Sequence, residues 1–452
     1  MKTFSINTLG CKVNQYESQQ IRQLLEQFGL SMSETAQKAD LVVINTCCVT
    51  HTASAKSRQN IRKAQKLSPE AVIIVSGCLP TVQIDELSNP GENVHLINHR
   101  ESLPATLAQI IGVKTASLSS ESPQSCKFNR VNQLKLPQLT HFRSHTRAFL
   151  KIQDGCDGYC SYCIVPKTRP FVHSKPPETV LEEAQALVKS GHKEIVVTGI
   201  FLGAYGQKSA RRKTWPSQLN KKLAEILDKM ANIPNLARIR LSSLEPTDVT
   251  PQLLDIFSKN RNIMPHLHLS LQSGSDAILK RMGRQYGADE FINKVNSIKS
   301  RLYRPAITTD IIVGFPGETD DDFEKTINLA KDVGFAKMHI FSFSPRKGTP
   351  AANMQDTVDN RVIKIRVKEL CDLNNQLESK FREQFIGETA TILTENSNQK
   401  TCGRSERYFM VYLDKETGKP EKNQLVRVKL IRNAEKGLIG KLDTQKQWLN
   451  NS

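Results

Sequence analysis

Two hydrophobic periods alternate along the first hundred residues of the chain. Apolar, β-branched runs are separated by segments in which apolar residues recur with helical spacing. The strand-like runs are residues 4–9, 40–45 and 71–76, and the helical segments are 14–27 and 53–66. Strands that alternate with helices in this way are typical of a parallel sheet built from β–α–β units. We therefore expect an N-terminal parallel α/β domain over residues 1–112.

The same alternation returns over residues 147–375 with six further strands. These are predicted at residues 148–153, 194–198, 237–242, 266–271, 306–314 and 337–343, with helices between them. Six β–α repeats with short loops indicate a (β/α)6 partial barrel, although a doubly wound sheet fits the pattern nearly as well. Residues 113–146 show no sustained period. Because residues 112–153 hold seven Lys and Arg against one Glu, we interpret this stretch as a basic linker.

The sequence predicts a last domain over residues 376–446. A long charged helix at 358–385 runs into this domain, and the pattern changes again after the helix. Short segments alternate apolar and polar residues between turn-forming stretches, which predicts a small antiparallel β-barrel. Its basic residues are interleaved with aromatic ones, an arrangement that suits RNA. The candidate RNA-binding residues are Arg404, Arg407, Arg427, Lys429 and Arg432. For the aromatic Phe409, packing in the barrel core is the better interpretation.

The charge balance points to a polyanionic partner. The 452 residues include 63 Lys and Arg against 45 Asp and Glu, a net charge of +18. Nucleic acid is favoured over an anionic membrane surface, because no Lys-rich helix with a bulky apolar face is evident. No apolar run approaches the roughly 18–20 residues that cross a bilayer, and the N-terminus lacks a signal-peptide pattern. We expect a cytoplasmic protein that does not bind membranes.

Three cysteines within eight residues form the sharpest motif. Cys156, Cys160 and Cys163 lie on a Gly-containing loop directly after the first predicted barrel strand. A structural zinc site requires four ligands, and no fourth Cys or His lies close in sequence. Three thiolates instead suit a 4Fe-4S cluster with one iron left open to bind a small molecule. The carboxyl end of a barrel strand is also where such folds place their active sites.

The N-terminal domain holds a second set of three cysteines. Cys11, Cys47 and Cys78 each follow a predicted strand and precede a helix, so they converge at one edge of a parallel sheet. A nearby helix amino terminus is expected to lower the pKa of each thiol. A second open-iron site is therefore plausible, with three buried structural cysteines as the alternative. Spacing alone does not separate Cys47 from its neighbour Cys48; Cys47 is favoured because it closes the Asn-Thr-Cys element.

The C-x3-C-x2-C loop resembles the signature of radical S-adenosylmethionine enzymes. Across the chain, TLGCKVNQYES, INTCCVT, SGCLP, GCDGYCSYCIVPKTRP, LSLQSGSD and TDIIVGFPGET occur in this order. This series resembles the methylthiotransferase branch of that superfamily, which combines a cluster domain, a radical barrel and a C-terminal TRAM domain. The Cys-Lys-Val-Asn-Gln form of the first motif is similar to the threonylcarbamoyladenosine tRNA methylthiotransferases.

The resemblance implies two 4Fe-4S clusters and S-adenosylmethionine as cofactors. Cys156, Cys160 and Cys163 would hold the radical cluster, and Cys11, Cys47 and Cys78 would hold an auxiliary cluster that delivers sulfur. The implied or possible contacts to S-adenosylmethionine or substrate are Tyr162, Thr198, Gly199, Gln272 and Asp310. Thr198 and Gly199 depart from the Gly-Gly-Glu often found there in the superfamily. Gln272 and Asp310 are placed at strand ends facing one mouth of the barrel, where helix capping is the equally good alternative.

The implied reaction is the methylthiation of threonylcarbamoyladenosine at position 37 of tRNA, in the anticodon loop. The implied partners are this tRNA and an electron donor of the flavodoxin or ferredoxin type. One alternative is the same chemistry on isopentenyladenosine in tRNA or on a ribosomal protein. The other is a non-catalytic iron–sulfur protein that binds RNA.

Overall fold

The structure, a computed structural model, describes residues 1–87, 91–113, 134–143, 145–216, 220–397, 400–414 and 420–443. Its chain forms two compact units. The first contains Met1–Arg143 with two short later segments, Cys163–Pro170 and Arg346–Gly348; the second contains the rest. Much of the expected basic linker lies outside the described residues. Within the described part of the chain, we find no helix with the length and apolar character needed to cross a membrane.

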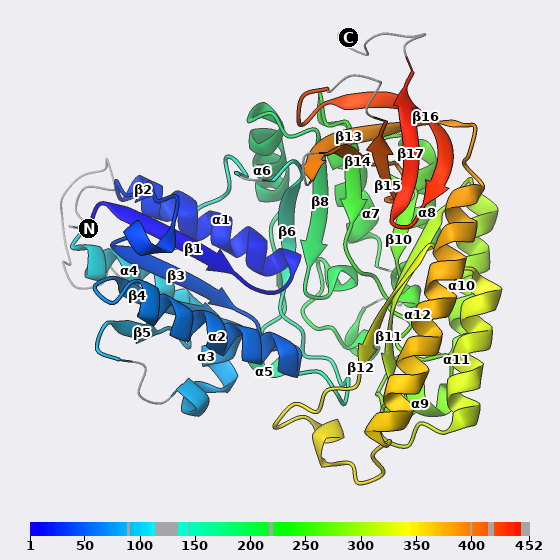
Figure 1. The fold of residues 1–452 in the computed structure, drawn as a ribbon, viewed down its shortest axis with the longest axis horizontal. Coiled ribbons are helices and arrows are strands. Elements are labelled where there is room, and N and C mark those ends of the chain that lie inside the picture. Colours follow the sequence, from blue (N-terminus) through cyan, green and yellow to red (C-terminus); the bar gives the residue numbers. More distant parts are fainter. Residues whose placement is uncertain are drawn as a thin grey trace. The chain divides into compact units, whose positions relative to one another are not determined.

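The first unit is built on a parallel sheet of five strands in the order β2-β1-β3-β4-β5 (Figure 1). The strands are β1 (Thr3–Thr8), β2 (Ser31–Met32), β3 (Leu41–Thr46), β4 (Val72–Gly77) and β5 (Val94–Leu96). The helices are α1 (Lys12–Gln27), α2 (His51–Leu67), α3 (Cys78–Val82), α4 (Leu103–Ile111) and α5 (Val165–Thr168). The expected parallel α/β domain is confirmed.

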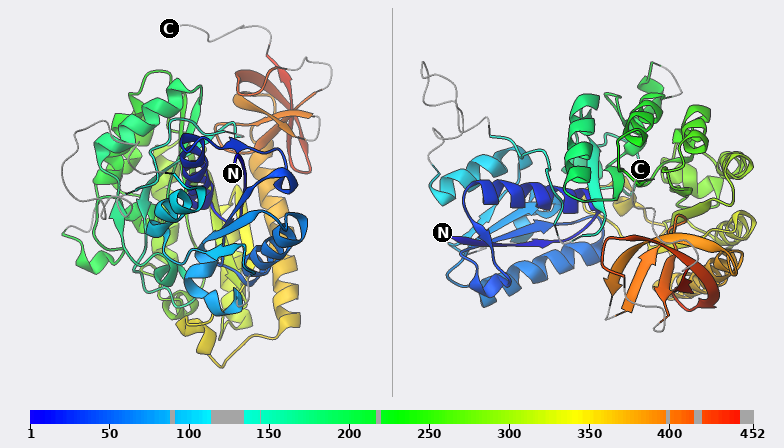
Figure 2. Two further views of the ribbon diagram at one scale, coloured as in Figure 1. Left: turned by 90° about the vertical axis from the view of Figure 1, so that its left-hand side faces the viewer. Right: turned by 90° about the horizontal axis from the view of Figure 1, so that it is seen from above.

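Both faces of this sheet are covered, because alternate residues of its strands point to opposite sides. Val43 and Ile74 pack beneath α1 and α4, whereas Val42 and Ile73 pack beneath α2 and α3. Such two-sided burial explains why the central strands read as continuous apolar runs. Figure 2 shows the two helical layers in its right-hand view.

The second unit contains six parallel strands in two groups, together with one short strand that pairs antiparallel to the first of them. One sheet has the order β7-β6-β8-β9 and the other β10-β11-β12, and an isolated bridge between Leu244 and Leu269 connects them. The strands are β6 (Ala148–Asp154), β7 (His173–Ser174), β8 (Glu194–Gly199), β9 (Arg238–Leu241), β10 (His266–His268), β11 (Ala306–Val313) and β12 (Lys337–Ser342). No ladder joins β6 to β12 among the described residues, so the barrel is open, as the sequence predicts.

Helices cover the outer side of these strands (Figure 1). They are α6 (Pro177–Lys189), α7 (Lys222–Ala231), α8 (Pro251–Lys259), α9 (Asp276–Arg281), α10 (Ala288–Arg301), α11 (Asp320–Val333) and α12 (Asn360–Glu383). Thr319 and Asp322 form a capping box at the start of α11. The helix α12 is continuous across residue 375, where the sequence places a domain boundary.

The C-terminal strands close into a barrel in the order β13-β14-β15-β17-β16. They are β13 (Thr389–Ser397), β14 (Lys400–Arg404), β15 (Met410–Leu413), β16 (Leu425–Ala434) and β17 (Gly437–Leu442). The β15–β17 pair is parallel, whereas a purely antiparallel barrel was expected. Phe381 and Phe385, at the end of α12, pack into the core of this barrel.

Candidate iron–sulfur centres

The first cysteine set gathers at one edge of the N-terminal sheet. Cys11, Cys47 and Cys78 directly follow or closely follow β1, β3 and β4, which are neighbours in that sheet. The three thiols influence one another electrostatically, so the structure brings them together as the sequence predicts. Gly10 permits this approach: its φ is +102°, and a Cβ added there would lie 2.8 Å from Cβ of Cys47.

Each sulfur atom of this set receives a hydrogen-bond donor. Arg100 Nη2 donates to Sγ of Cys78 over 3.2 Å, and the backbone N–H groups of Asn14 and Val49 donate to Cys11 and Cys47. Donors aimed at sulfur stabilise the thiolate, the form that ligates iron. The surroundings therefore fit a cluster with three cysteine ligands.

The sequence predicts that helix amino termini lower the pKa of all three thiols, and this prediction is wrong for Cys11 and Cys47. Burial raises the pKa of Cys47 to about 11, and the pKa of Cys11 is also raised, first through desolvation. The pKa of Cys78 is lowered because Cys48 donates its S–H toward it and Arg100 lies beside it. Cys48 also donates to the carbonyl of Cys78 over 3.4 Å. This donor role supports the choice of Cys47 over Cys48 as the ligand.

A buried ion pair fixes the segment Cys163–Pro170 within the first unit. Arg169 donates to both carboxylate oxygens of Glu17 over 2.7 Å, and both side chains are buried. Arg100 Nη1 adds a bond of 3.0 Å to the carbonyl of Thr168. Sequence reasoning missed these roles because the partners are 152 and 68 residues apart. Arg169 thus has a structural role within the first unit.

The second cysteine set lies on the loop after β6. Cys156 and Cys160 belong to the second unit, and Cys163 follows three residues later at the start of the segment that packs in the first. Each sulfur accepts an N–H bond: from the backbone of Gly158 (3.3 Å), from Arg284 Nη1 (3.2 Å) and from the backbone of Val165 (3.4 Å), respectively. Burial raises the pKa of Cys156 to about 12. The donor set again fits thiolate ligands of an iron–sulfur cluster.

Gln153, at the end of β6, organises this loop and was not singled out in the sequence. Its Oε1 accepts from the backbone N–H of Phe201 (2.7 Å), and its Nε2 donates to the carbonyls of Asp154 and Gly155 (2.9 and 2.8 Å). Gly155 has φ +77°, and a Cβ there would lie 1.8 Å from the carbonyl oxygen of Phe171. Gln153 and Gly155 therefore set the direction in which the chain leaves the strand toward Cys156.

Arg284 anchors the other side of the same loop. It is fully enclosed, and its Nη2 pairs with Glu245 over 2.8 Å while its Nε donates to the hydroxyl of Tyr286 over 3.0 Å. The Tyr162 hydroxyl lies 3.5 Å from Arg284 Nη1, and the Tyr162 ring packs beside Met282. Arg284 thus links Tyr162 to Cys160, and the place of Tyr162 beside the cofactor stays a prediction.

The remaining candidate cofactor contacts lie in the second unit on β8, on β11 and four residues after the end of β10. Thr198 is buried in β8, and Gly199 ends that strand against Gln153. Gln272 has a left-handed backbone, φ +71°, and its N–H donates to the carbonyl of Asp310 over 2.8 Å. Asp310 lies in the middle of β11, so its expected position at a strand end is wrong.

The candidate RNA-binding residues divide into two groups. Arg404 donates to the carbonyl of Tyr408 (3.1 Å), and Arg407 donates to the carbonyls of Arg304 and Tyr303 (2.8 and 3.0 Å). These two arginines have structural contacts within the second unit. Arg427, Lys429 and Arg432 are instead exposed along β16, where the alternate residues Val428 and Leu430 fill the barrel core.

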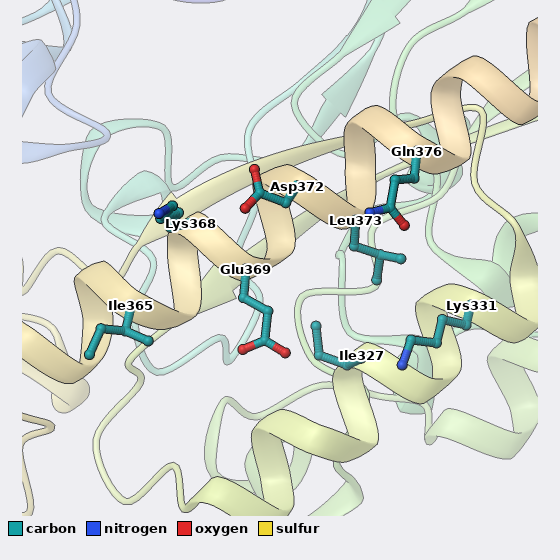
Figure 3. Close-up of a pocket in the computed structure, with 8 residues that line it drawn as sticks. All are labelled: Ile327, Lys331, Ile365, Lys368, Glu369, Asp372, Leu373 and Gln376. Carbon is teal, nitrogen blue, oxygen red and sulfur yellow. The ribbon is translucent and has the colours of Figure 1, made fainter.

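A surface pocket of about 350 Å³ lies between α11 and α12 on the outside of the open barrel (Figure 3). It is lined by Ile327, Lys331, Ile365, Lys368, Glu369, Asp372, Leu373 and Gln376. None of these residues is a candidate cofactor ligand, and their mixed charges point to no particular small molecule.

Comparisons with known proteins agree with this geometry. Residues 150–330 match the model of the radical SAM superfamily, and residues 3–98 match the uncharacterized protein family UPF0004. A Bacillus subtilis protein named threonylcarbamoyladenosine tRNA methylthiotransferase MtaB is 37% identical over 92% of this chain and 89% of its own length. The chain belongs to the radical S-adenosylmethionine methylthiotransferases. It is a transferase of that family, which uses two 4Fe-4S clusters and S-adenosylmethionine.

Two other comparisons extend this result. A Neorickettsia sennetsu protein named tRNA-2-methylthio-N(6)-dimethylallyladenosine synthase is 33% identical over 92% of this chain and 88% of its own length. The solved structure of the radical S-adenosylmethionine methyltransferase TsrM from Kitasatospora setae superposes with a TM-score of 0.54. The superposition covers 78% of this chain and 77% of the TsrM chain. The sequence identity is 15%, so this similarity shows a shared fold only.

Proposed function

We propose that this methylthiotransferase acts on tRNA and converts N6-threonylcarbamoyladenosine at position 37 to its 2-methylthio derivative. The observation that carries the proposal is near full-length similarity to relatives named for this nucleoside. Three such proteins are 35–37% identical over 87–97% of this chain. Three relatives named for dimethylallyladenosine are 29–33% identical over 92–99% of this chain.

The chemistry explains why two clusters serve this reaction. C2 of adenosine carries an unactivated C–H bond, which acid–base catalysis alone does not functionalise. When bound by Cys156, Cys160 and Cys163, the radical cluster supplies the electron that cleaves S-adenosylmethionine. Cys11, Cys47 and Cys78 would hold the auxiliary cluster, which would supply the sulfur, and a flavodoxin- or ferredoxin-type protein is the proposed electron donor.

The chain's own residues hold these ligands in place. Arg284 and the backbone of Gly158 donate to the sulfur atoms of the radical loop, and Arg100 donates to Cys78. Gln153 fixes the path of the loop, and Tyr162, which lies on the loop, packs against an apolar cluster that contains Met282. Arg427, Lys429 and Arg432, exposed along β16, are proposed to contact tRNA phosphates near the anticodon loop.

Dimethylallyladenosine in tRNA is the second candidate substrate. The Neorickettsia relative named for it matches nearly the whole chain at an identity only four percentage points below the Bacillus relative. Membership of an enzyme family argues against the alternative of a non-catalytic RNA-binding protein.

Mass spectrometry of tRNA nucleosides distinguishes the two substrates. The enzyme is expressed in host cells that lack their own tRNA methylthiotransferases but make both precursor nucleosides. We expect 2-methylthio-threonylcarbamoyladenosine to appear with the parent enzyme and to be absent with Cys156→Ala. Formation of the methylthiolated dimethylallyl nucleoside alone would instead assign the second candidate, and absence of both products would overturn the tRNA assignment.

A further inference from the structure

Three potential metal ligands meet on one face of the sheet formed by β10, β11 and β12. His268 pairs in register with Thr308, and Asp310 pairs with His339. Because Thr308 and Asp310 are two residues apart on β11, His268, Asp310 and His339 all point to the same face. One ring nitrogen of each histidine and one carboxylate oxygen of the aspartate lie within 4.8 Å of one another.

The spacing of these groups is suited to a small cation. Nε2 of His268 lies 3.2 Å from Oδ2 of Asp310, and the two imidazole rings are 5.7 Å apart between centroids. Two ligands that each lie about 2.0 Å from a tetrahedral ion are separated by about 3.3 Å. The distance of 3.2 Å between Nε2 of His268 and Oδ2 of Asp310 is close to this value. A ring nitrogen of His339 lies within 4.8 Å of a ligand atom of each of these two residues, near enough to complete a three-ligand site.

A neighbouring hydroxyl group supports the role of His268. Oγ1 of Thr308 lies 3.0 Å from Nδ1 of His268, on the side of the ring opposite Asp310. Histidine ligands commonly donate their second ring N–H to such an acceptor, which directs the lone pair of the first nitrogen at the metal. With that tautomer, the Nε2 lone pair faces a carboxylate oxygen, and a cation between the two removes their repulsion.

We propose that His268, Asp310 and His339 form a site for a divalent transition-metal ion such as Zn²⁺ or Fe²⁺. Two imidazoles and one carboxylate are a ligand set that these ions accept while keeping further coordination positions open. His268 and Asp310 are partly exposed and His339 is exposed, so an ion can enter and an oxygen ligand can join it. The site shares no residue with either cysteine set and does not depend on the proposed substrate.

The test adds Zn²⁺ to the anaerobic enzyme with both clusters loaded, removes unbound metal by gel filtration, and measures bound zinc. X-ray absorption at the zinc edge then reports the ligands. We expect about one zinc per chain, bound at micromolar concentration or below, with nitrogen and oxygen neighbours near 2.0–2.1 Å and none at the 2.3 Å of sulfur.

Variants locate this zinc. His339→Ala and Asp310→Asn should weaken its binding at least tenfold, with iron content unchanged as evidence of an intact fold. His173→Ala, which removes an exposed histidine on β7, is the matched control and should bind as the parent does. Zinc bound only through sulfur, or bound equally by His339→Ala and the control, would overturn the proposal. Retention of no zinc by the parent enzyme would also overturn it, and this is the result expected if His268 and Asp310 form only a hydrogen bond.

Discussion

At the scale of single residues, one arginine side chain is directed at a sulfur atom in each cysteine set. Arg100 reaches Cys78 and Arg284 reaches Cys160, both over 3.2 Å. Hydrogen bonds and positive charge near cluster sulfurs favour the reduced state, which carries more negative charge. The two arginines are therefore expected to tune the clusters in addition to holding the loops.

Replacing Arg100 should lower the reduction potential of the auxiliary cluster. The variant Arg100→Gln is made in the background Cys156→Ala, Cys160→Ala and Cys163→Ala, so that one cluster remains. A charge-assisted hydrogen bond is worth about 1.5–3 kcal/mol. If part of this energy is lost only from the reduced state, the reduction potential falls by some tens of millivolts. Redox titration followed by electron paramagnetic resonance measures the shift. Arg62→Gln, an exposed arginine on α2, is the control; an equal potential in both variants would contradict the role of Arg100.

Gly10 should be essential for the auxiliary site because a side chain there would collide with Cys47. In Gly10→Ala, the new Cβ lies 2.8 Å from Cβ and 3.0 Å from Sγ of Cys47. We expect reconstituted iron to fall from about eight to about four per chain, the loss of one 4Fe-4S cluster. Gly29→Ala is a matched control, since Gly29 also has a positive φ, +85°, but open space around it. That variant should keep its iron, with a stability loss of about 1 kcal/mol from backbone strain. Equal iron in both variants would show that crowding of Cys47 is unimportant.

At the scale of elements, strands were predicted well and the contacts that hold their ends were not. The apolar runs of β3, β4 and β11 identify buried parallel strands because both sheet faces are covered. The strand β10 ends at His268, three residues before the predicted end, since Tyr286 donates to the carbonyls of Ser270 and Leu271 and Gln272 adopts a left-handed backbone.

In the candidate site, residues in local sequence patterns could be predicted, whereas residues that reach the site from distant parts of the chain could not. All six cysteines could be proposed as ligands from the sequence because ligand spacing and strand ends are local patterns. Arg100 and Arg284 could not, because they lie 22 and 124 residues from the sulfur atoms that they contact. The metal ligand set of His268, Asp310 and His339 likewise appears only once the register of three strands is known.

The turn between β11 and α11 is held by a buried ion pair to α12. Glu318 accepts from the backbone N–H of Gly314 (2.8 Å) and from Arg366 Nη1 (2.7 Å), and both charged side chains are buried. Glu318→Ala leaves the guanidinium of Arg366 without its buried partner. We expect a loss of about 3–5 kcal/mol in the free energy of unfolding, measured with urea. Asp320→Ala removes the other partner of Arg366, an almost fully exposed carboxylate, and should cost less than about 1 kcal/mol. Similar losses in the two variants would contradict this account.

At the scale of the whole molecule, the C-terminal barrel is structurally tied to the open barrel within the second unit. Arg238 donates to the carbonyls of Arg404 and Thr391 (3.0 and 2.6 Å), and Arg240 donates to those of Ser405 and Glu406 (2.6 and 2.8 Å). Arg240 is fully buried and also pairs with Glu194 over 2.8 Å. Deleting residues 387–452 would remove these carbonyls and leave buried guanidinium groups unsatisfied, so the deletion should unfold this unit. A test of RNA binding therefore requires surface substitutions.

The triple variant Arg427→Ala, Lys429→Ala and Arg432→Ala supplies that test. These side chains project from β16 away from the barrel core, so their loss should leave stability and reductive cleavage of S-adenosylmethionine unchanged. Each phosphate contact contributes about −0.7 to −0.9 to the slope of log binding constant against log salt concentration. We expect the slope for tRNA to flatten by about two to three and the apparent KM for tRNA to rise. Arg407→Ala is the matched control: its guanidinium bonds to the carbonyls of Tyr303 and Arg304, so it should reduce stability while keeping the salt slope. A parent-like slope in the folded triple variant would exclude this strand from the tRNA-binding surface, and the basic excess of the chain would have to act elsewhere.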